Sequence, residues 1–324
     1  MKRTQLTYFA VPAIAFVMAA PAQAQKTPWG DPDLQGRWSN PTLTPLQRPA
    51  DLGDKQFFTE DEAKVYVRQR IAATSGDANI ETDRSAGNVG SYNDAWMDRG
   101  NDIVPTRRTS LIVEPANGRV PPFTAAAQSE YERNQAHAAA HPADTPEDRY
   151  LTERCIGFGG GHAPMLPEPY NNNYYIVQTP EYVTIMAELN HEVRIIPIDG
   201  RPHLPASVRQ WTGDSRGRFE GDTLVVETTN QIPHRHYYGV QMLNSVMSDQ
   251  FKVVERFTRT GPEQIRYRAT VTDPVFTAPW TVEIFMHPQR GELVEFACHE
   301  GNYGMRGILS ATREEERRAK ESGR

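Results

Sequence analysis

The stretch "FKVVERFTRTGPEQIRYRATVT", residues 251–272, carries the pattern that decides the fold. Successive side chains of a β-strand point to opposite faces, so Phe251, Val253 and Phe257 share one face. Glu255 falls on that same apolar face. After a short polar turn, a second run alternates in the same way. Two alternating runs joined by such a turn predict an antiparallel β-hairpin.

Similar short runs follow one another through the second half of the chain. Turn clusters rich in Gly, Pro and Asp separate them, and we assign residues 213–222 to one of these turns. No helical segment between the runs is long enough for a crossover, so the sheet should be antiparallel. Such a run of strands indicates a closed barrel or a strongly curved sheet. Because closure removes exposed sheet edges, we predict a mainly β protein with an antiparallel up-and-down, lipocalin-like barrel. The predicted strands are 174–178, 182–188, 192–198, 207–212, 223–229, 251–259, 264–273, 280–286 and 292–298.

The first 24 residues have the features of a secretory signal peptide. A positive start at Lys2 and Arg3 precedes an apolar run that is too short to span a bilayer comfortably, and the segment ends in Ala-Gln-Ala. We therefore expect cleavage after Ala24 and export, to a bacterial periplasm or to the medium. No later segment reaches the roughly 18 apolar residues that a membrane helix needs, so we expect no membrane span.

The region 25–150 should form an N-terminal arm and helices that pack on the barrel. Residues 26–56 are rich in Pro, Gly and Asp, and we expect them to be extended. A capping-box pattern at Thr59 begins a predicted helix over 60–73. A second helix is predicted over 125–140.

The barrel should then occupy residues 151–310, and the charged segment 311–324 should form a helix or a tail. The formal net charge is −6, and loss of Lys2 and Arg3 with the signal peptide makes it −8 because that segment contains no acid. Phosphate binding needs a basic face, so this balance argues against nucleic acid as a partner. The sequence does not indicate an oligomeric state.

The chain has two cysteines, Cys155 and Cys298. In an oxidising compartment they are expected to form a disulfide, which argues against a reactive thiolate at Cys298. The bridge would close a loop of about 140 residues and could stabilise the fold by about 5 kcal/mol in the chain-entropy model.

Two further motifs suggest ligand sites at first sight. The segment "GFGGGHAP", 157–164, is rich in glycine but lacks the Gly-Lys-Ser/Thr ending of a phosphate loop, and His162 replaces the last glycine of a dinucleotide fingerprint. His234 and His236 lie on one side of an extended segment and could begin a metal site, but no spacing specifies a third ligand. We therefore expect neither a cofactor nor a defined metal site.

Charged residues on otherwise apolar strand faces are the first candidates for a functional site. Arg194 shares a face with Ile196 and Ile198, and Glu227 lies within the run 223–229. An unpaired charge is costly to bury, so each of these residues needs a partner, a ligand or water. They could line a small-molecule pocket in the barrel. Alternatively, they form surface pairs or salt bridges at the barrel ends.

The segment "EFACHEGNYGM", residues 295–305, places His299 and Glu300 directly after Cys298. A disulfide would fix the backbone immediately before His299. A histidine held in this way can act as an acid or a base, because the ordinary pKa of histidine lies near neutrality. The alternative is a disulfide-anchored strand end whose polar residues bond to the backbone.

Together these residues define the predicted site. His299 is the candidate acid or base, with Glu300 or Glu227 as its partner. Arg194 could hold an anionic group or a developing oxyanion, and His191 is a second candidate base. We predict that His299, Glu300, Arg194 and Glu227 converge at one mouth of the barrel.

Several motifs together resemble a widespread group of exported bacterial proteins of largely uncharacterised function. They include "HEVRIIPIDGRPHLP", "GDSRGRFEGDTLVVET" and "ACHEGNYGM", and the resemblance covers roughly residues 27–315. The second motif is also similar to a lipocalin-type hairpin. Lipocalin-like barrels include both binding proteins and cofactor-free enzymes, so this resemblance does not choose between them.

The leading hypothesis is an exported, cofactor-independent acid–base enzyme of the lyase, isomerase or hydrolase type that acts on a small apolar or aromatic molecule. The first alternative is a periplasmic, lipocalin-like binding protein for a hydrophobic ligand. The second is a structural or interaction module of the cell envelope. Turnover of a substrate would separate the first two hypotheses.

Overall fold

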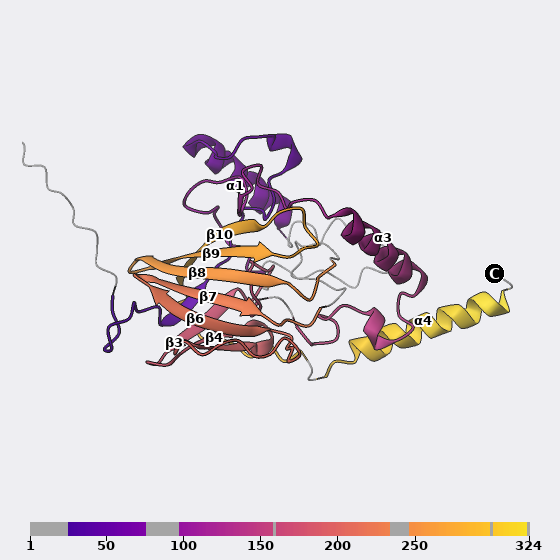
Figure 1. Cartoon of the computed structure of the whole chain (residues 1–324). Helices are drawn as coiled ribbons and strands as arrows, with labels where there is room; N and C mark the ends of the chain where they lie inside the picture. The colour runs from indigo at the N-terminus through magenta and orange to yellow at the C-terminus, as the bar shows by residue number, and fades with distance from the viewer. Residues whose placement is uncertain (1–24, 76–96, 158–159, 234–245, 299–300, 323–324) are drawn as a thin grey trace, which may run out of the picture.

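The computed structural model describes residues 25–75, 97–157, 160–233, 246–298 and 301–322. Nine strands curve into a nearly closed antiparallel barrel, hydrogen-bonded in the order β5-β4-β3-β1-β10-β9-β8-β7-β6 (Figure 1). The predicted fold class is confirmed. The nine strands are β1 (Gly36–Ser39), β3 (Asn173–Gln178), β4 (Tyr182–Ala187), β5 (Val193–Pro197), β6 (Asp214–Glu220), β7 (Thr223–Thr229), β8 (Lys252–Gly261), β9 (Gln264–Thr272) and β10 (Trp280–Pro288).

The N-terminal arm contributes a strand to the barrel wall. β1 pairs with β3 on one side and with β10 on the other, so the meander closes through a strand from the arm. Leu34 and Trp38 anchor the arm in the core, whereas Trp29 is 37% exposed. Outside the nine-strand path, β2 (Ile112–Glu114) pairs with β10.

Two predicted strands and one predicted turn are wrong. Residues 207–212 and 292–298 form no strand. The segment 213–222, which is rich in turn-forming residues, instead contains β6, which pairs with β7 from Asp214↔Thr229 to Glu220↔Thr223. Glycine, serine and arginine have low or moderate strand propensity, so the composition of β6 does not predict a strand. The strand forms because it pairs with β7 in the folded barrel.

Gly217 explains how β6 approaches β5, which lies at the other end of the hydrogen-bonded path. A Cβ atom at Gly217 would lie 2.9 Å from side-chain carbons of Ile196 and Ile198. Glycine is therefore required at this seam by close approach. The side chains of Ile196 and Ile198 cover β6 there, at the one junction of the nine-strand order that is not hydrogen-bonded.

The interior of the barrel is filled by side chains. Inward-facing residues of several strands are almost fully buried and belong to one core. Its members include Trp38, Tyr174, Ile176, Ile185, Ile196, Leu224, Val226, Val253, Phe257, Ile265, Tyr267, Ala269, Ile284 and Met286.

Three α-helices accompany the barrel in the described chain: α1 (Glu60–Thr74), α3 (Ala125–Ala140) and α4 (Gly304–Glu321). The predicted capping box of α1 is present, with Thr59 and Glu62 bonded reciprocally. Thr124 caps α3. Three short 3-10 turns, Ala50–Leu52, Pro146–Asp148 and Leu189–His191, also occur within the described residues.

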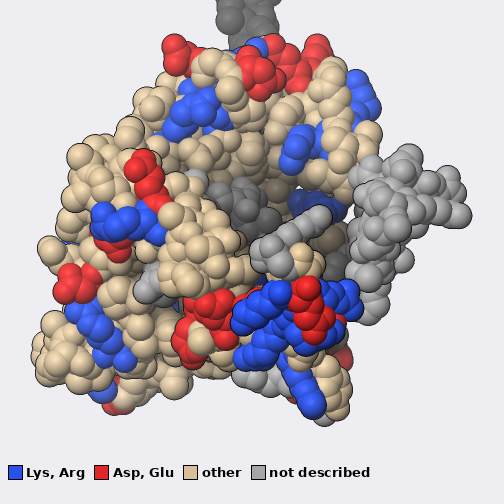
Figure 2. All heavy atoms as spheres, turned by 90° about the vertical axis from the view of Figure 1, so that its right-hand side faces the viewer, with Lys and Arg blue, Asp and Glu red and all other residues tan. Residues whose placement is uncertain are grey.

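The C-terminal charged segment is helical, and its helix begins at Gly304. In Figure 1, α4 extends away from the barrel, and Figure 2 shows its acidic and basic side chains gathered on the face turned toward the viewer. Among the described residues, none of the helices has the length and apolar character needed to cross a membrane.

Candidate functional site

Arg194 is placed by β5 in the interior of the barrel, where it forms a buried ion pair. Its guanidinium donates to both carboxylate oxygens of Glu255 on β8, at 2.7 and 3.0 Å. The side chains are only 1% and 0% exposed, respectively. Bidentate geometry of this kind is the strongest form of an arginine–carboxylate contact.

The surroundings of this pair are also hydrogen-bonded. The hydroxyl of Tyr267 donates to Glu255 at 2.9 Å and accepts from the backbone N–H of Met165 at 2.8 Å. Burial lowers the pKa of Arg194, but the charge and hydrogen bonds of Glu255 outweigh burial, and the net pKa is raised. Burial, with the charge of Glu255, raises the pKa of Tyr267. The guanidinium therefore stays charged, and it neutralises and hydrogen-bonds the buried carboxylate of Glu255.

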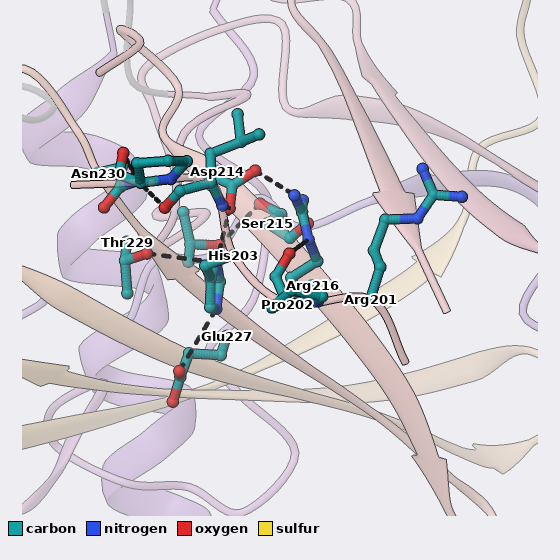
Figure 3. A network of polar contacts seen from close by, with 12 residues as sticks. Arg201, Pro202, His203, Asp214, Ser215, Arg216, Glu227, Thr229 and Asn230 are labelled. Atoms are coloured by element: carbon teal, nitrogen blue, oxygen red, sulfur yellow. Dashed lines mark hydrogen bonds and ion pairs between the residues drawn. The ribbon is translucent and has the colours of Figure 1, made fainter. Parts of the chain in front are cut away.

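Glu227 lies on the other face of the wall. Its neighbour Val226 faces the core and is directly opposite Glu255 in the register, so Glu227 points outward. There, Oε1 of Glu227 is 3.4 Å from Nε2 of His203 (Figure 3). Its Oε2 is 3.4 Å from the ammonium group of Lys252.

His203 comes from the connection between β5 and β6, and carboxylates contact both of its ring nitrogens. Nδ1 lies 2.7 Å from Oδ2 of Asp214, the first residue of β6, and Nε2 faces Glu227. Asp214 is buried and also accepts from Arg216 and from the backbone N–H of Leu204 (Figure 3). These contacts tie the connection to β6 and β7, so the network has a structural role at the seam.

The predicted convergence of the candidate residues is wrong for the part that the structure describes. Arg194 and Glu227 lie on opposite faces of the wall, because the two-residue period of β7 turns Glu227 away from Val226 and hence from Glu255. His299 and Glu300 lie outside the described residues, as do His234 and His236. The described residues contain no group of three or more His, Cys, Asp or Glu side chains that could hold a metal ion.

The predicted disulfide is present and shapes the region beside His191. Cys155 and Cys298 are bonded, with their Cα atoms 5.6 Å apart. Residues 289–298, which we call the strap, run from the end of β10 to this bridge. Nε2 of His191 accepts a hydrogen bond of 3.1 Å from the backbone N–H of Phe296 in the strap. His191 therefore positions the strap.

A cavity of about 530 Å³ lies between the strap, β1 and β3. Ser39 and Asn173 line it, and they alternate with the core residues Trp38 and Tyr174, so the cavity lies on the outer side of the barrel wall. We call it the strap cavity. Its lining residues are Ser39, Met97, Asp98, Tyr170, Asn171, Asn173, Glu188, Gln289, Val294, Glu295 and Phe296.

Glu188 is the best-anchored polar group of this cavity. It is buried and follows the last residue of β4. One carboxylate oxygen accepts from Nδ2 of Asn171 at 2.5 Å. The other accepts from Nδ2 of Asn173 at 3.2 Å and from the backbone N–H of Val294 at 3.3 Å. Glu188 thereby joins β3, β4 and the strap.

Asp98 is the second carboxyl group of the cavity and is half-buried. Its backbone is fixed by hydrogen bonds to Pro169 and from Asn172. Burial raises the pKa of the Asp98 carboxyl, hydrogen bonds from Asn172 lower it, and the charge of Glu188 raises it again, with a net upward shift. A carboxyl group that resists ionisation beside a buried carboxylate is a common arrangement for proton transfer.

Most of these residues were missed from the sequence. Asp98 lies in a polar stretch that reads only as a loop, and Glu188 follows a strand without any motif. One usable signal is the run "YNNN", residues 170–173. Asparagine tolerates the left-handed backbone that Asn171 adopts, with φ of 55°, and such residues often mark functional turns.

No protein-family model matches the chain, and neither the curated proteins nor the solved structures include a significant match.

Proposed function

We propose that this protein is exported and binds a small organic molecule in the strap cavity. The disulfide between Cys155 and Cys298 supports export, because such bonds persist in oxidising compartments. The resemblance to a group of exported bacterial proteins supports the same proposal.

The observation that carries the binding proposal is the make-up of the cavity wall. Small-molecule sites combine apolar and aromatic surface with a few fixed polar groups in a space of roughly 300–1,000 Å³. The strap cavity offers Tyr170, Val294 and Phe296 on the apolar side. Glu188, held by three hydrogen bonds, and Asp98 supply fixed polar groups. The ring centroids of Tyr170 and Phe296 lie 6.2 Å apart in a stacked arrangement.

Binding should depend on Phe296. We would screen the mature protein by thermal shift and ligand-observed NMR against aromatics, terpenoids, sterols and sugars. Phe296→Ala removes an aromatic side chain from the cavity wall. The affinity for each compound that binds should fall by about 10-fold or more, which corresponds to about 1–3 kcal/mol for a lost apolar contact. Tyr303→Ala is the matched control, because Tyr303 is 79% exposed and does not line the cavity. Hits that bind equally well to both variants would place the ligand elsewhere.

Asp98 favours a second candidate function, a cofactor-independent acid–base enzyme at the same cavity. A positioned carboxyl group typically contributes about 10²–10⁴-fold to such a reaction. Asp98→Asn should therefore abolish most of the turnover of a bound compound, as followed by mass spectrometry, while binding persists. If wild-type protein returns every hit unchanged, the protein is a binder. A catalytic role for His299 and Glu300, which follow the strap, stays a prediction.

A further inference from the structure

We infer that the ligand of the strap cavity is an organic cation, a molecule with a protonated amine beside an apolar or aromatic group. This inference rests on the proposed binding function and names its substrate class. Three independent properties of the lining lead to it: an unmatched hydrogen-bond acceptor, the sign of the charges and the aromatic surface.

The first property is an acceptor without a donor. Asn173 is 8% exposed, and its Nδ2 is used by Glu188 at 3.2 Å. That contact fixes the orientation of the amide, and Oδ1 has no hydrogen-bond partner among the described residues. A buried acceptor left unsatisfied is costly, and Asn173 lines the cavity, so a ligand group that reaches Oδ1 and donates a hydrogen bond to it would remove this cost.

The second property is the charge of the lining. Three acidic residues, Asp98, Glu188 and Glu295, line the cavity. No lysine or arginine is found among the lining residues that the structure describes. An anionic ligand would meet like charges at short range, whereas a cation would be attracted. The apolar side of the same wall favours an organic cation over a hydrated inorganic one.

The third property is the aromatic wall. The faces of tyrosine and phenylalanine rings attract cations within about 6 Å of the ring centre. Tyr170 and Phe296 both line the cavity, and the backbone N–H of Phe296 donates a hydrogen bond to His191. An ammonium group can therefore contact a carboxylate and a ring face in one cavity, and it has N–H donors to offer to Oδ1 of Asn173.

A cationic ligand also couples binding to protons. The pKa of Asp98 is raised in the free protein by burial and by the charge of Glu188. A bound ammonium group stabilises the ionised carboxylate, so binding releases a proton wherever Asp98 is protonated beforehand. Affinity should then rise with pH until Asp98 is ionised in the free protein.

The test compares three probes of one shape: benzylamine, which is cationic at neutral pH, benzyl alcohol and benzoate. Isothermal titration calorimetry and ligand-observed NMR on the mature protein at fixed ionic strength should show benzylamine binding about 10-fold or more tightly than benzyl alcohol. Benzoate should bind most weakly. Asp98→Asn should reduce the preference for benzylamine, whereas Asp222→Asn, which removes an equal charge from an exposed turn, should leave it unchanged.

The outcomes separate this inference from the proposed function. If benzyl alcohol or benzoate binds as tightly as benzylamine, and Phe296→Ala weakens that binding, the cavity binds ligands but the cationic class is wrong. The cationic class is also wrong if benzylamine does not bind while neutral library compounds bind in a manner that depends on Phe296. If no compound depends on Phe296, both the proposed function and this inference are overturned.

Discussion

The interior of the barrel and the strap cavity both contain carboxylates beside apolar surface. The two regions differ in the groups that pair with these carboxylates. In the interior, Arg194 and Tyr267 satisfy Glu255, and all three groups are buried. In the cavity, amide and backbone donors satisfy Glu188, while no basic residue among the described lining faces Asp98.

The difference separates stability from function. A charge that is matched and fully buried inside the protein is closed to a ligand, and removal of its partner destabilises the fold. A half-buried carboxyl group without a neighbouring cation is unfavourable in its ionised form, and a cationic ligand can stabilise that form. The following predictions test this contrast, from the largest expected effect to the smallest.

Arg194→Met should have the largest effect. It leaves Glu255 buried without its partner, and such a loss typically costs about 3–5 kcal/mol in the free energy of unfolding. Chemical denaturation at neutral pH measures the change. Arg256→Met is the control, because the pair of Arg256 with Glu220 on the outer wall is half-exposed and should contribute less than about 1 kcal/mol.

The double variant Arg194→Met with Glu255→Leu sharpens the result. It removes both charges, so stability should recover by a large part of the loss seen for Arg194→Met alone. If the double variant is as unstable as the single variant, the cost comes from packing and not from an unmatched charge. Equal stability of all three proteins would show that the interior pair is solvated.

Cys298→Ser should have the next largest effect and should act on the cavity. The bridge spans a sequence separation of 143 residues, and loss of such a bond typically costs about 2–4 kcal/mol. The strap also loses its anchor beside Phe296, so ligand binding should weaken. Denaturation and ligand titration of Cys298→Ser and of Cys155→Ser should agree. Unchanged binding in both would show that the hydrogen bonds of His191 and Glu188 hold the strap without the disulfide.

His203→Ala tests the matched network on the outer wall. Asp214 would lose one of its buried hydrogen bonds and keep those from Arg216 and Leu204, so we expect a loss of about 1–2 kcal/mol. The exposed His287→Ala is the control and should stay within about 0.5 kcal/mol. Ligand binding at the strap cavity should be unchanged, and a loss there would mean that the seam is part of the site.

The fold was largely predictable because local signals dominated it. Alternation in residues 251–272 and the capping box at Thr59 are written in neighbouring residues, and both predictions are confirmed. β6 was missed because its pairing with β7 and its contact with β5 are properties of the closed barrel. The wall strand β1 was missed for the same reason.

The site was less predictable because its residues meet only through the fold. Alternation placed Arg194 and Glu255 on apolar faces, which contained the signal for their pairing, but not which strands would bring them together. Asp98, Asn173 and Glu188 come from a loop, a strand start and a strand end. No spacing in the sequence relates them.

Asp98→Asn should have the smallest effect on stability and the most informative dependence on pH. Asp98 has a raised pKa in the folded protein, so the folded state binds its proton more tightly than the unfolded state does. Between the ordinary aspartate pKa of 3.8 and the raised folded value, stability therefore falls as pH rises, and above that window the loss is constant. Asp98→Asn has no carboxyl group at this position, so it does not lose this stability as pH rises.

Without ligand, Asp98→Asn should match wild type at the acid end of that window and exceed it at neutral pH. The gain should be about 1 kcal/mol or less, since water reaches the half-buried carboxyl and screens it. Denaturation across the pH series measures this gap. With benzylamine present, the order should reverse, because the carboxylate that destabilises the free protein then pairs with a cation. If wild type is already the more stable protein at neutral pH without ligand, donors within the protein satisfy Asp98, and the contrast between the interior and the cavity disappears.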